Sequence, residues 1–222
     1  LRIVTGGLPE LPGATILERR RYMRENLDHV RRALMWEPRG HYDMYGCVLT
    51  PPVSPEAHFG VLFLHNEGYS TMCGHGVIAL VTALLETGAF PADGARTAVN
   101  LDTPAGLVRA TAHLGAGGRV ERVSFLNVAS FLYARDVPLD VPGYGALHTD
   151  VAFGGAFYAV LPAERVGLHV APEFAAQLVA AGSAITAAVN ATLPIRHPYE
   201  PDLGFLYGTI LTSPPEDPAH HS

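Results

Sequence analysis

The sequence predicts an α+β fold, in which helices and runs of strands are segregated along the chain. Its predicted elements follow in the order helix, strands, apolar helix, strands, helix, strand. This order differs from the strand–helix alternation of a doubly wound parallel sheet and is typical of sheets that pack on helices. A repeat of about 20–50 residues, the sign of a solenoid or a propeller, is not evident in the sequence. We therefore expect sheets curled around helices.

The first predicted elements are a strand over residues 1–4 and a helix over 15–35. Thr15 and Glu18 have the spacing of a capping box, in which a hydroxyl and a carboxylate each satisfy a free backbone N–H. The helix contains six arginines, which we interpret as a solvated face paired with acidic neighbours rather than as an anion-binding face. The apolar positions at helical spacing, expected to form the buried stripe, are Ile16, Met23, Leu27, Val30 and Leu34.

Two further helices and a series of strands are predicted beyond this point. Residues 74–87 are apolar on nearly every face, which indicates a helix surrounded by protein. Residues 172–193 predict an alanine-rich helix with one apolar face. The strands are expected at 43–53 and 58–68, near 98–101, 107–113, 120–126, 130–134, 149–153 and 156–161, and within 202–211.

The composition is that of a folded protein with a substantial core. Of its 222 residues, 48% are hydrophobic and 16% are charged, which is ordinary for a globular protein. The net charge of -6 argues against nucleic acid as the main partner. The longest apolar run, 77–85, is too short to cross a bilayer, and the start of the chain does not resemble a signal peptide. Two cysteines do not make a disulfide framework, so we expect a cytoplasmic protein with no membrane partner.

Cys73 is the residue with the strongest chemical signal. It stands at the predicted start of the apolar helix, in the stretch Met72-Cys73-Gly74-His75-Gly76. Free N–H groups and the dipole at a helix N-terminus favour negative charge, so we expect the pKa of this thiol to be lowered and its thiolate to act as a base or nucleophile. The same N–H groups can hold a carboxylate. A cysteine at a helix start is nevertheless more often structural than catalytic, and the residues alone leave both interpretations open.

The remaining titratable residues give weaker signals. Cys47 lies in the middle of a predicted strand, where a buried and inert thiol is expected. We interpret His75 as an orienting or structural group rather than a general base. The histidines form no HExxH or Cys/His cluster, and the chain has neither a GxGxxG motif nor a P-loop. We therefore expect no metal and no nucleotide cofactor.

The stretch "MCGHGVIAL" resembles the first catalytic-cysteine motif of the proline racemase superfamily. The likeness extends over nearly the whole chain, and the segments "RRYMRENLDHVRRALMWEPRGHYDMYG", "LFLHNEGYSTMCGHGVIAL", "DVAFGGAFYAV" and "HPYEPDLGFLYGTIL" are similar to the branch that dehydrates trans-3-hydroxy-L-proline. This resemblance implies a two-lobed fold like that of diaminopimelate epimerase. Each lobe would be a curled sheet around a central helix, with a first lobe over 1–110 and an incomplete second lobe over 111–222.

The resemblance also implies roles for individual residues. Cys73 matches the base that removes the Cα proton, and Gly74 and His75 match positions whose backbone N–H groups hold the substrate carboxylate. No cofactor is implied. We take Asp202 as a candidate for binding the ring nitrogen, together with His197, although an ordinary loop role is the alternative for each.

Two motifs of the superfamily are not found in the sequence. One, Asp-x-His-Thr-x-Gly-Glu-Pro, normally stands just before the position of Leu1. The other, Asp-Arg-Ser-Pro-(Cys or Thr)-Gly-(Thr or Ser)-Gly, normally follows "FLYGTIL" and supplies the residue on the opposite face of the substrate. We therefore expect residues 1–222 on their own to be inactive.

The resemblance implies a lyase that converts trans-3-hydroxy-L-proline into pyrroline-2-carboxylate, with Cys73 as the proton acceptor. One alternative is a cofactor-independent proline racemase or 4-hydroxyproline 2-epimerase, which needs a second thiol on the opposite face. An alternative of another class is a lobe that binds an imino acid without turning it over. The expected partner in every case is a small imino acid. The oligomeric state stays open, with a homodimer as one candidate.

Overall fold

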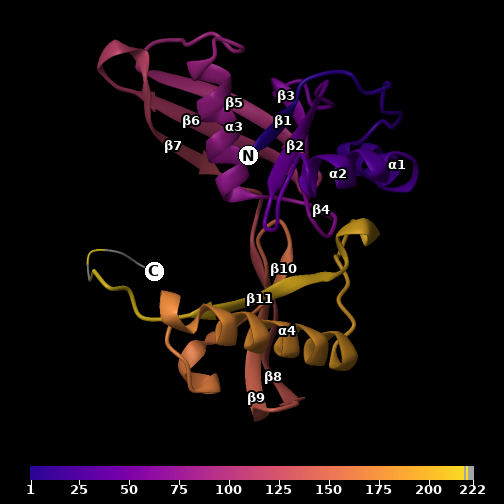
Figure 1. Ribbon diagram of the computed structural model, residues 1–222, viewed down its shortest axis with the longest axis vertical. Coiled ribbons are helices and arrows are strands. Elements are labelled where there is room, and N and C mark those ends of the chain that lie inside the picture. The colour runs from indigo at the N-terminus through magenta and orange to yellow at the C-terminus, as the bar shows by residue number, and fades with distance from the viewer. Residues whose placement is uncertain (218, 220–222) are drawn as a thin grey trace. The chain divides into compact units, whose positions relative to one another are not determined.

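The computed structural model describes residues 1–217 and 219, and its helices and strands confirm the predicted α+β class (Figure 1). The chain divides into two compact units, Leu1–Val128 and Ala129–Ser222. The boundary expected near residue 110 falls inside strand β6 (Gly106–Leu114). The units divide later because β6 pairs along its length with the strands on both sides of it. Each unit is described by itself below.

A seven-stranded sheet forms the centre of the first unit. Its strands follow in the order β1-β2-β3-β5-β6-β7, and β4 pairs with β3. The pairs β1/β2 and β3/β5 are parallel, whereas β2/β3, β5/β6 and β6/β7 are antiparallel. Besides β6, the strands are β1 Arg2–Val4, β2 Tyr45–Thr50, β3 Phe59–His65, β4 Tyr69–Ser70, β5 Arg96–Thr103 and β7 Val120–Leu126.

Helices cover both faces of this sheet, which explains why β3 is apolar without alternation. Successive side chains of a strand point to opposite faces. Val61 and Phe63 pack with helix α3 (Gly74–Glu86), whereas Leu62 and Leu64 pack with the helices of the other face. All four of these side chains have no exposed surface. Burying a large apolar side chain contributes about 1.5–3 kcal/mol, so β3 is a main source of stability for this unit.

The segment 15–35 forms two helices rather than the single helix predicted. These are α1 (Ile16–Asn26) and α2 (Asp28–Met35), and Leu27 between them leaves helical geometry with φ -126° and ψ 18°. The predicted capping box is confirmed, because the Glu18 N–H donates to Thr15 Oγ1 at 3.1 Å and the Thr15 N–H donates to a Glu18 carboxylate oxygen at 3.2 Å. The predicted stripe is confirmed as the face that packs on the sheet.

The interpretation of the helix arginines as a solvated face is wrong for Arg20 and Arg31. Both are buried, with 7% and 6% of their surface exposed. Arg20 donates to the Tyr69 carbonyl oxygen at 2.6 Å, and Arg31 donates to the carbonyls of His65, at 3.0 Å, and Asn66. These guanidinium groups hold the helices to the β3–β4 turn, whose carbonyls need donors where water is excluded.

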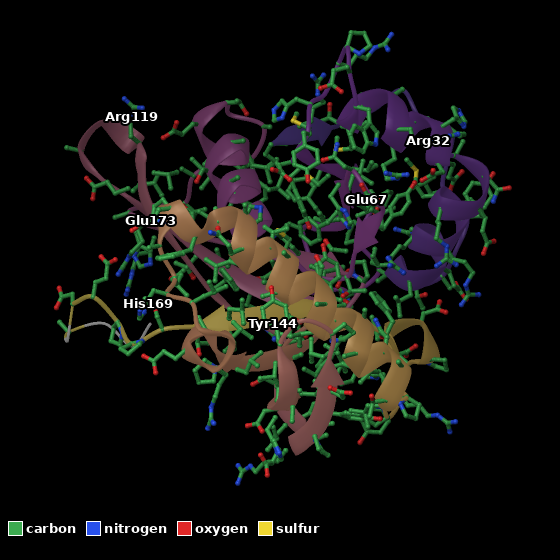
Figure 2. The ribbon with its side chains drawn as sticks, turned by 60° about the horizontal axis from the view of Figure 1, so that its bottom comes forward. Arg32, Glu67, Arg119, Tyr144, His169 and Glu173 are labelled. Atoms are coloured by element: carbon green, nitrogen blue, oxygen red, sulfur yellow. The ribbon has the colours of Figure 1, made fainter. Side chains whose placement is uncertain are left out.

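We expect Arg31→Ala to lower the free energy of unfolding by on the order of 3 kcal/mol, because it leaves buried carbonyls and a carboxylate without their donor. Arg31 also bonds Asp28, at 2.6 Å, and this contact lowers the pKa of the aspartate below its usual value. Arg32→Ala is the matched control: Arg32, labelled in Figure 2, has 66% of its side chain exposed, so we expect a loss under about 1 kcal/mol. Urea unfolding of both variants measures the difference, and equal losses would contradict the anchoring role.

In the described part of the second unit, a four-stranded sheet carries one α-helix. The strand order is β11-β10-β9-β8, with β10/β11 parallel and the other pairs antiparallel. Helix α4 packs on this sheet through Ala181, Ile185 and Val189, which are fully buried. The elements are β8 Phe131–Val141, β9 Gly145–Phe153, β10 Phe157–Pro162, α4 Ala175–Thr192 and β11 Leu206–Thr212. Short 3-10 turns occur in this unit at Ala163–Val166, Pro172–Phe174 and Pro201–Leu203. The first unit has one at Ala116–Gly118.

The opposite face of this second sheet exposes apolar side chains. Thr209 bonds Thr186 of α4, with 2.9 Å between their hydroxyl oxygens, so the next residue, Ile210, points to the face away from α4. Ile210 is 43% exposed, and Leu132, which the strand pairing places on the same face, is 46% exposed. This face therefore leaves apolar surface uncovered in the second unit.

The stretch Pro172–Thr192 is long and apolar enough to cross a membrane, by length and composition only. One such helix is weak evidence, because a core helix of a soluble protein passes the same test. A groove of about 750 Å³ runs between α4 and β11. Since α4 packs on the sheet through its buried residues, we treat it as a helix of this unit.

Candidate active site

Cys73 is the N-cap residue of α3, as the sequence predicts. Its backbone is extended, with φ -148° and ψ 108°, and its sulfur accepts a hydrogen bond from the Gly76 N–H at 3.3 Å. Gly76 allows this close approach, because a Cβ at this position would lie only 3.1 Å from the sulfur and 3.0 Å from the Phe63 ring. The local geometry therefore directs the thiol back over the first turn of α3.

Tyr45 and His75 interact with the sulfur, and Tyr45 is itself held by Ser70 and His65. Tyr45, the first residue of β2, hydrogen-bonds to Cys73 through its hydroxyl and also bonds the hydroxyl of Ser70 at the end of β4. The nitrogen atoms of the His75 ring lie 3.5 and 3.6 Å from the sulfur. The Tyr45 ring lies edge-on to the His75 ring, with 5.0 Å between centroids, and stacks on the His65 ring at 5.9 Å. Cys73 thus interacts with a phenol and an imidazole, and the phenol in turn contacts the Ser70 hydroxyl and the His65 ring.

The pKa of the Cys73 thiol is raised, which corrects the expectation of a lowered value. Burial is the main cause, since only 8% of the residue is exposed and burial penalises the thiolate. Hydrogen bonds from the Tyr45 hydroxyl and from the Gly76 and His75 N–H groups oppose this effect. The helix terminus provides the predicted donors, but burial by the surrounding protein raises the pKa more than these donors lower it.

The first turn of α3 has the form expected of a carboxylate site. Gly74 and His75 are its first two residues, and the first N–H groups of a helix have no partner within the helix. A Cβ at Gly74 would lie 3.1 Å from the Phe125 ring, so this glycine keeps the chain close to the sheet. The His75 side chain is exposed, so this end of α3 presents both backbone donors and an imidazole.

Asp202 and His197 belong to the second unit, and the structure does not assign them to the Cys73 site. Asp202 lies in the 3-10 turn Pro201–Leu203. His197 accepts hydrogen bonds at Nδ1 from the N–H groups of Tyr199, at 3.3 Å, and Glu200, at 3.0 Å. Its ring also packs edge-on against Phe153 at 4.8 Å, and burial lowers its pKa. These contacts favour the loop role for His197.

Cys47 provides a contrast with Cys73. It is fully buried in strand β2, and burial raises the pKa of its thiol to about 12. Both thiols are free. The groove of the second unit and a smaller one of about 280 Å³ near Val4 and Pro51 are lined by other residues than the Cys73 motif. Within residues 1–217 and 219, no group of three or more His, Cys, Asp or Glu side chains could hold a metal ion.

Comparison with known proteins gives a consistent set of matches. The model of the family described as proline racemase matches residues 1–222. The chain is 54% identical over 215 residues to human trans-3-hydroxy-L-proline dehydratase, covering 96% of this chain and 61% of the relative. It is 48% identical over 217 residues to a 3-hydroxyproline 2-epimerase from Burkholderia multivorans, covering 98% and 64%. The chain therefore spans about three fifths of the length of these curated relatives.

Solved structures agree with the sequence matches. A hydroxyproline epimerase from Agrobacterium vitis, solved with bound trans-4-hydroxy-L-proline, superposes with a TM-score of 0.90 at 29% identity, covering 98% of this chain and 63% of that one. A probable proline racemase from Agrobacterium radiobacter, solved with bound carbonate, gives 0.88 at 34% identity, covering 93% and 61%.

Proposed function

The chain belongs to the proline racemase family, and from this premise we propose that the protein dehydrates trans-3-hydroxy-L-proline to pyrroline-2-carboxylate. The observation that carries the proposal is a thiol at the N-terminus of α3, embedded in a sequence 54% identical to a human dehydratase of this substrate. The proposed ligand is accordingly a small imino acid, and the proposed compartment is the cytoplasm.

We also propose that the two units correspond to the two lobes of a fold like that of diaminopimelate epimerase. The first unit supports this, since its sheet is covered by α3 on one face and by α1 and α2 on the other. The second unit has a helix on one face only among its described residues. The substrate would bind at the N-terminus of α3.

In the proposed mechanism the substrate carboxylate binds the N–H groups of Gly74 and His75, and the Cys73 thiolate removes the Cα proton. The electron pair of the Cα–H bond is held first as a carbanion next to the carboxylate, and then forms the C2–C3 double bond as the 3-hydroxyl takes a proton from an acid and departs as water. Fixed N–H donors stabilise the charge that develops on the carboxylate, and exclusion of water strengthens this interaction. A carboxylate close to the sulfur would disfavour ionisation of the thiol. The thiolate therefore has to form before the substrate binds, or the thiol has to pass its proton to a neighbouring group.

The test is to incubate the full chain that contains residues 1–222 with trans-3-hydroxy-L-proline and to follow the products by NMR. Pyrroline-2-carboxylate is the expected product. Inversion at Cα without loss of water would instead support an epimerase, in line with the Burkholderia relative. Binding without either change would support an imino-acid-binding role.

We expect pyrrole-2-carboxylate, a planar mimic of the deprotonated Cα, to bind more tightly than the substrate, as transition-state analogues do. Its carboxylate should lie on the N–H groups of Gly74 and His75. A crystal structure of the complex and a calorimetric titration measure both expectations. A carboxylate bound to the arginines of α1 and α2 would remove the case for this site.

A further inference from the structure

The proposed substrate fixes the face on which its leaving group departs. In trans-3-hydroxy-L-proline the hydroxyl and the carboxylate lie on opposite faces of the ring, so the Cα proton and the hydroxyl lie on the same face. A base that removes this proton therefore stands on the same side as the departing oxygen. The acid that protonates the hydroxyl has to be found next to Cys73. This step rests on the proposed function.

Two side chains with exchangeable protons contact the Cys73 sulfur, namely Tyr45 and His75. The Tyr45 ring stacks on the His65 ring and lies edge-on to the His75 ring, and its hydroxyl bonds Ser70, which is 1% exposed. His75 by contrast lies at the exposed end of α3. The phenol beside the sulfur is therefore held by contacts with three side chains.

We propose that Tyr45 is the general acid that protonates the departing 3-hydroxyl, on the same face of the substrate as Cys73. A phenol ordinarily has a pKa of about 10 and keeps its proton at neutral pH. An imidazolium ordinarily has a pKa near 6.5 and has mostly lost its acidic proton at neutral pH. A general acid has to be in its protonated form when the substrate binds. A phenol that is fixed beside the base can meet this condition.

Cys73, Tyr45 and the substrate together account for every proton that moves in this reaction. The Cys73 thiolate first takes the Cα proton, and the electron pair of the C–H bond is held as a carbanion stabilised by the carboxylate. This pair then forms the C2–C3 double bond as the C3–O bond breaks and the departing oxygen takes the Tyr45 proton. The products are water, the enamine form of pyrroline-2-carboxylate, a Cys73 thiol and a Tyr45 phenolate, to which the Ser70 hydroxyl donates. Because the Tyr45 hydroxyl and the Cys73 sulfur are hydrogen-bonded, the thiol then returns its proton to the phenolate, and the starting state is restored without another reactant.

The experiment removes the phenol oxygen and follows two reactions of the same substrate. In the full chain, Tyr45→Phe should lower the rate of dehydration by at least about 100-fold, the usual lower range for general acid catalysis. Cys73 is unchanged, so in D₂O the unreacted substrate should gain deuterium at Cα, which mass spectrometry and NMR detect. Tyr42→Phe is the matched control, because Tyr42 is 71% exposed on the same segment, and it should behave as wild type.

The outcomes separate the roles that Tyr45 could have. Dehydration by Tyr45→Phe at the wild-type rate would overturn the proposal, with Cys73 then passing the proton to the hydroxyl itself. Loss of both dehydration and deuterium uptake, with an unchanged melting curve, would also overturn it, because Tyr45 would then act only by positioning the thiol. If Tyr45→Phe does not fold, Ser70→Ala serves instead: dehydration should fall while deuterium uptake persists, and an unchanged rate would overturn the proposal. A wild-type protein that inverts Cα without dehydration would refute the proposed function itself.

Discussion

Cys73→Ser, made in the full chain that contains residues 1–222, is expected to abolish conversion of trans-3-hydroxy-L-proline while the fold stays intact. A serine hydroxyl ionises far less than a thiol at neutral pH, so the base is lost, and we expect the rate to fall by on the order of 10³-fold or more. Serine is a preferred N-cap residue and can accept the Gly76 N–H as the sulfur does. The start of α3 should therefore be kept.

Measurement of turnover together with thermal unfolding checks this expectation. Cys47→Ser is the control, because Cys47 is fully buried in strand β2 and lies outside the Met72–Gly76 motif. It should keep most of its activity but lose some stability, since the new hydroxyl is fully buried. Wild-type turnover in Cys73→Ser would show that another group is the base.

Residues 1–222 produced alone are expected to give no measurable turnover. The family resemblance implies a second set of donors and an opposite-face residue on the motif that follows "FLYGTIL" in related proteins, and no segment of this sequence matches that motif. Removing a single preorganised donor typically costs about 10²–10³ in rate, and here several would be missing together. A site open to water also weakens each charge interaction on which deprotonation depends.

The same polypeptide is expected to associate in solution. Ile210 and Leu132 expose apolar surface on the sheet face away from α4, and uncovered apolar patches favour aggregation. Size-exclusion chromatography and an assay for pyrroline-2-carboxylate test both expectations on one preparation. Turnover close to that of the longer protein would show that residues 1–222 already form the whole site.

The sequence was sufficient for the position of the thiol but not for its electrostatics. The apolar stretch after Cys73 predicts α3 and its first turn, and the structure places Cys73 at that N-cap. The direction of its pKa shift depends on burial by elements distant in the chain, which helix-terminus reasoning does not include. The prediction of a lowered pKa for Cys73 is therefore wrong because it leaves out burial by the tertiary structure.

Tyr45 was missed for the same reason. It is an unremarkable aromatic residue at the start of a strand, and only the pairing of β2 with β3 brings it beside the loop that follows β4. The buried arginines of α1 and α2 were missed because helical spacing identifies apolar faces and assigns charged residues to solvent. Strand β8 was predicted over 130–134 only, because its register shifts between Ala134 and Val137 interrupt the alternation on which such predictions depend.

The burial of both faces of β3 has a consequence for local unfolding of the first unit. Its two hydrophobic clusters lie on opposite faces of one strand, so loss of either helical layer exposes half of the same four-residue core. Detachment of α3 or of the α1–α2 pair should therefore not occur as a low-energy local fluctuation, and amide protons of β3 should exchange only at the cost of unfolding the whole unit. Since β4, which follows the β3–β4 turn, ends three residues before Cys73, the loop that carries Cys73 should share the cooperativity of the core. Its geometry should then persist on the timescale of global unfolding rather than of loop motion.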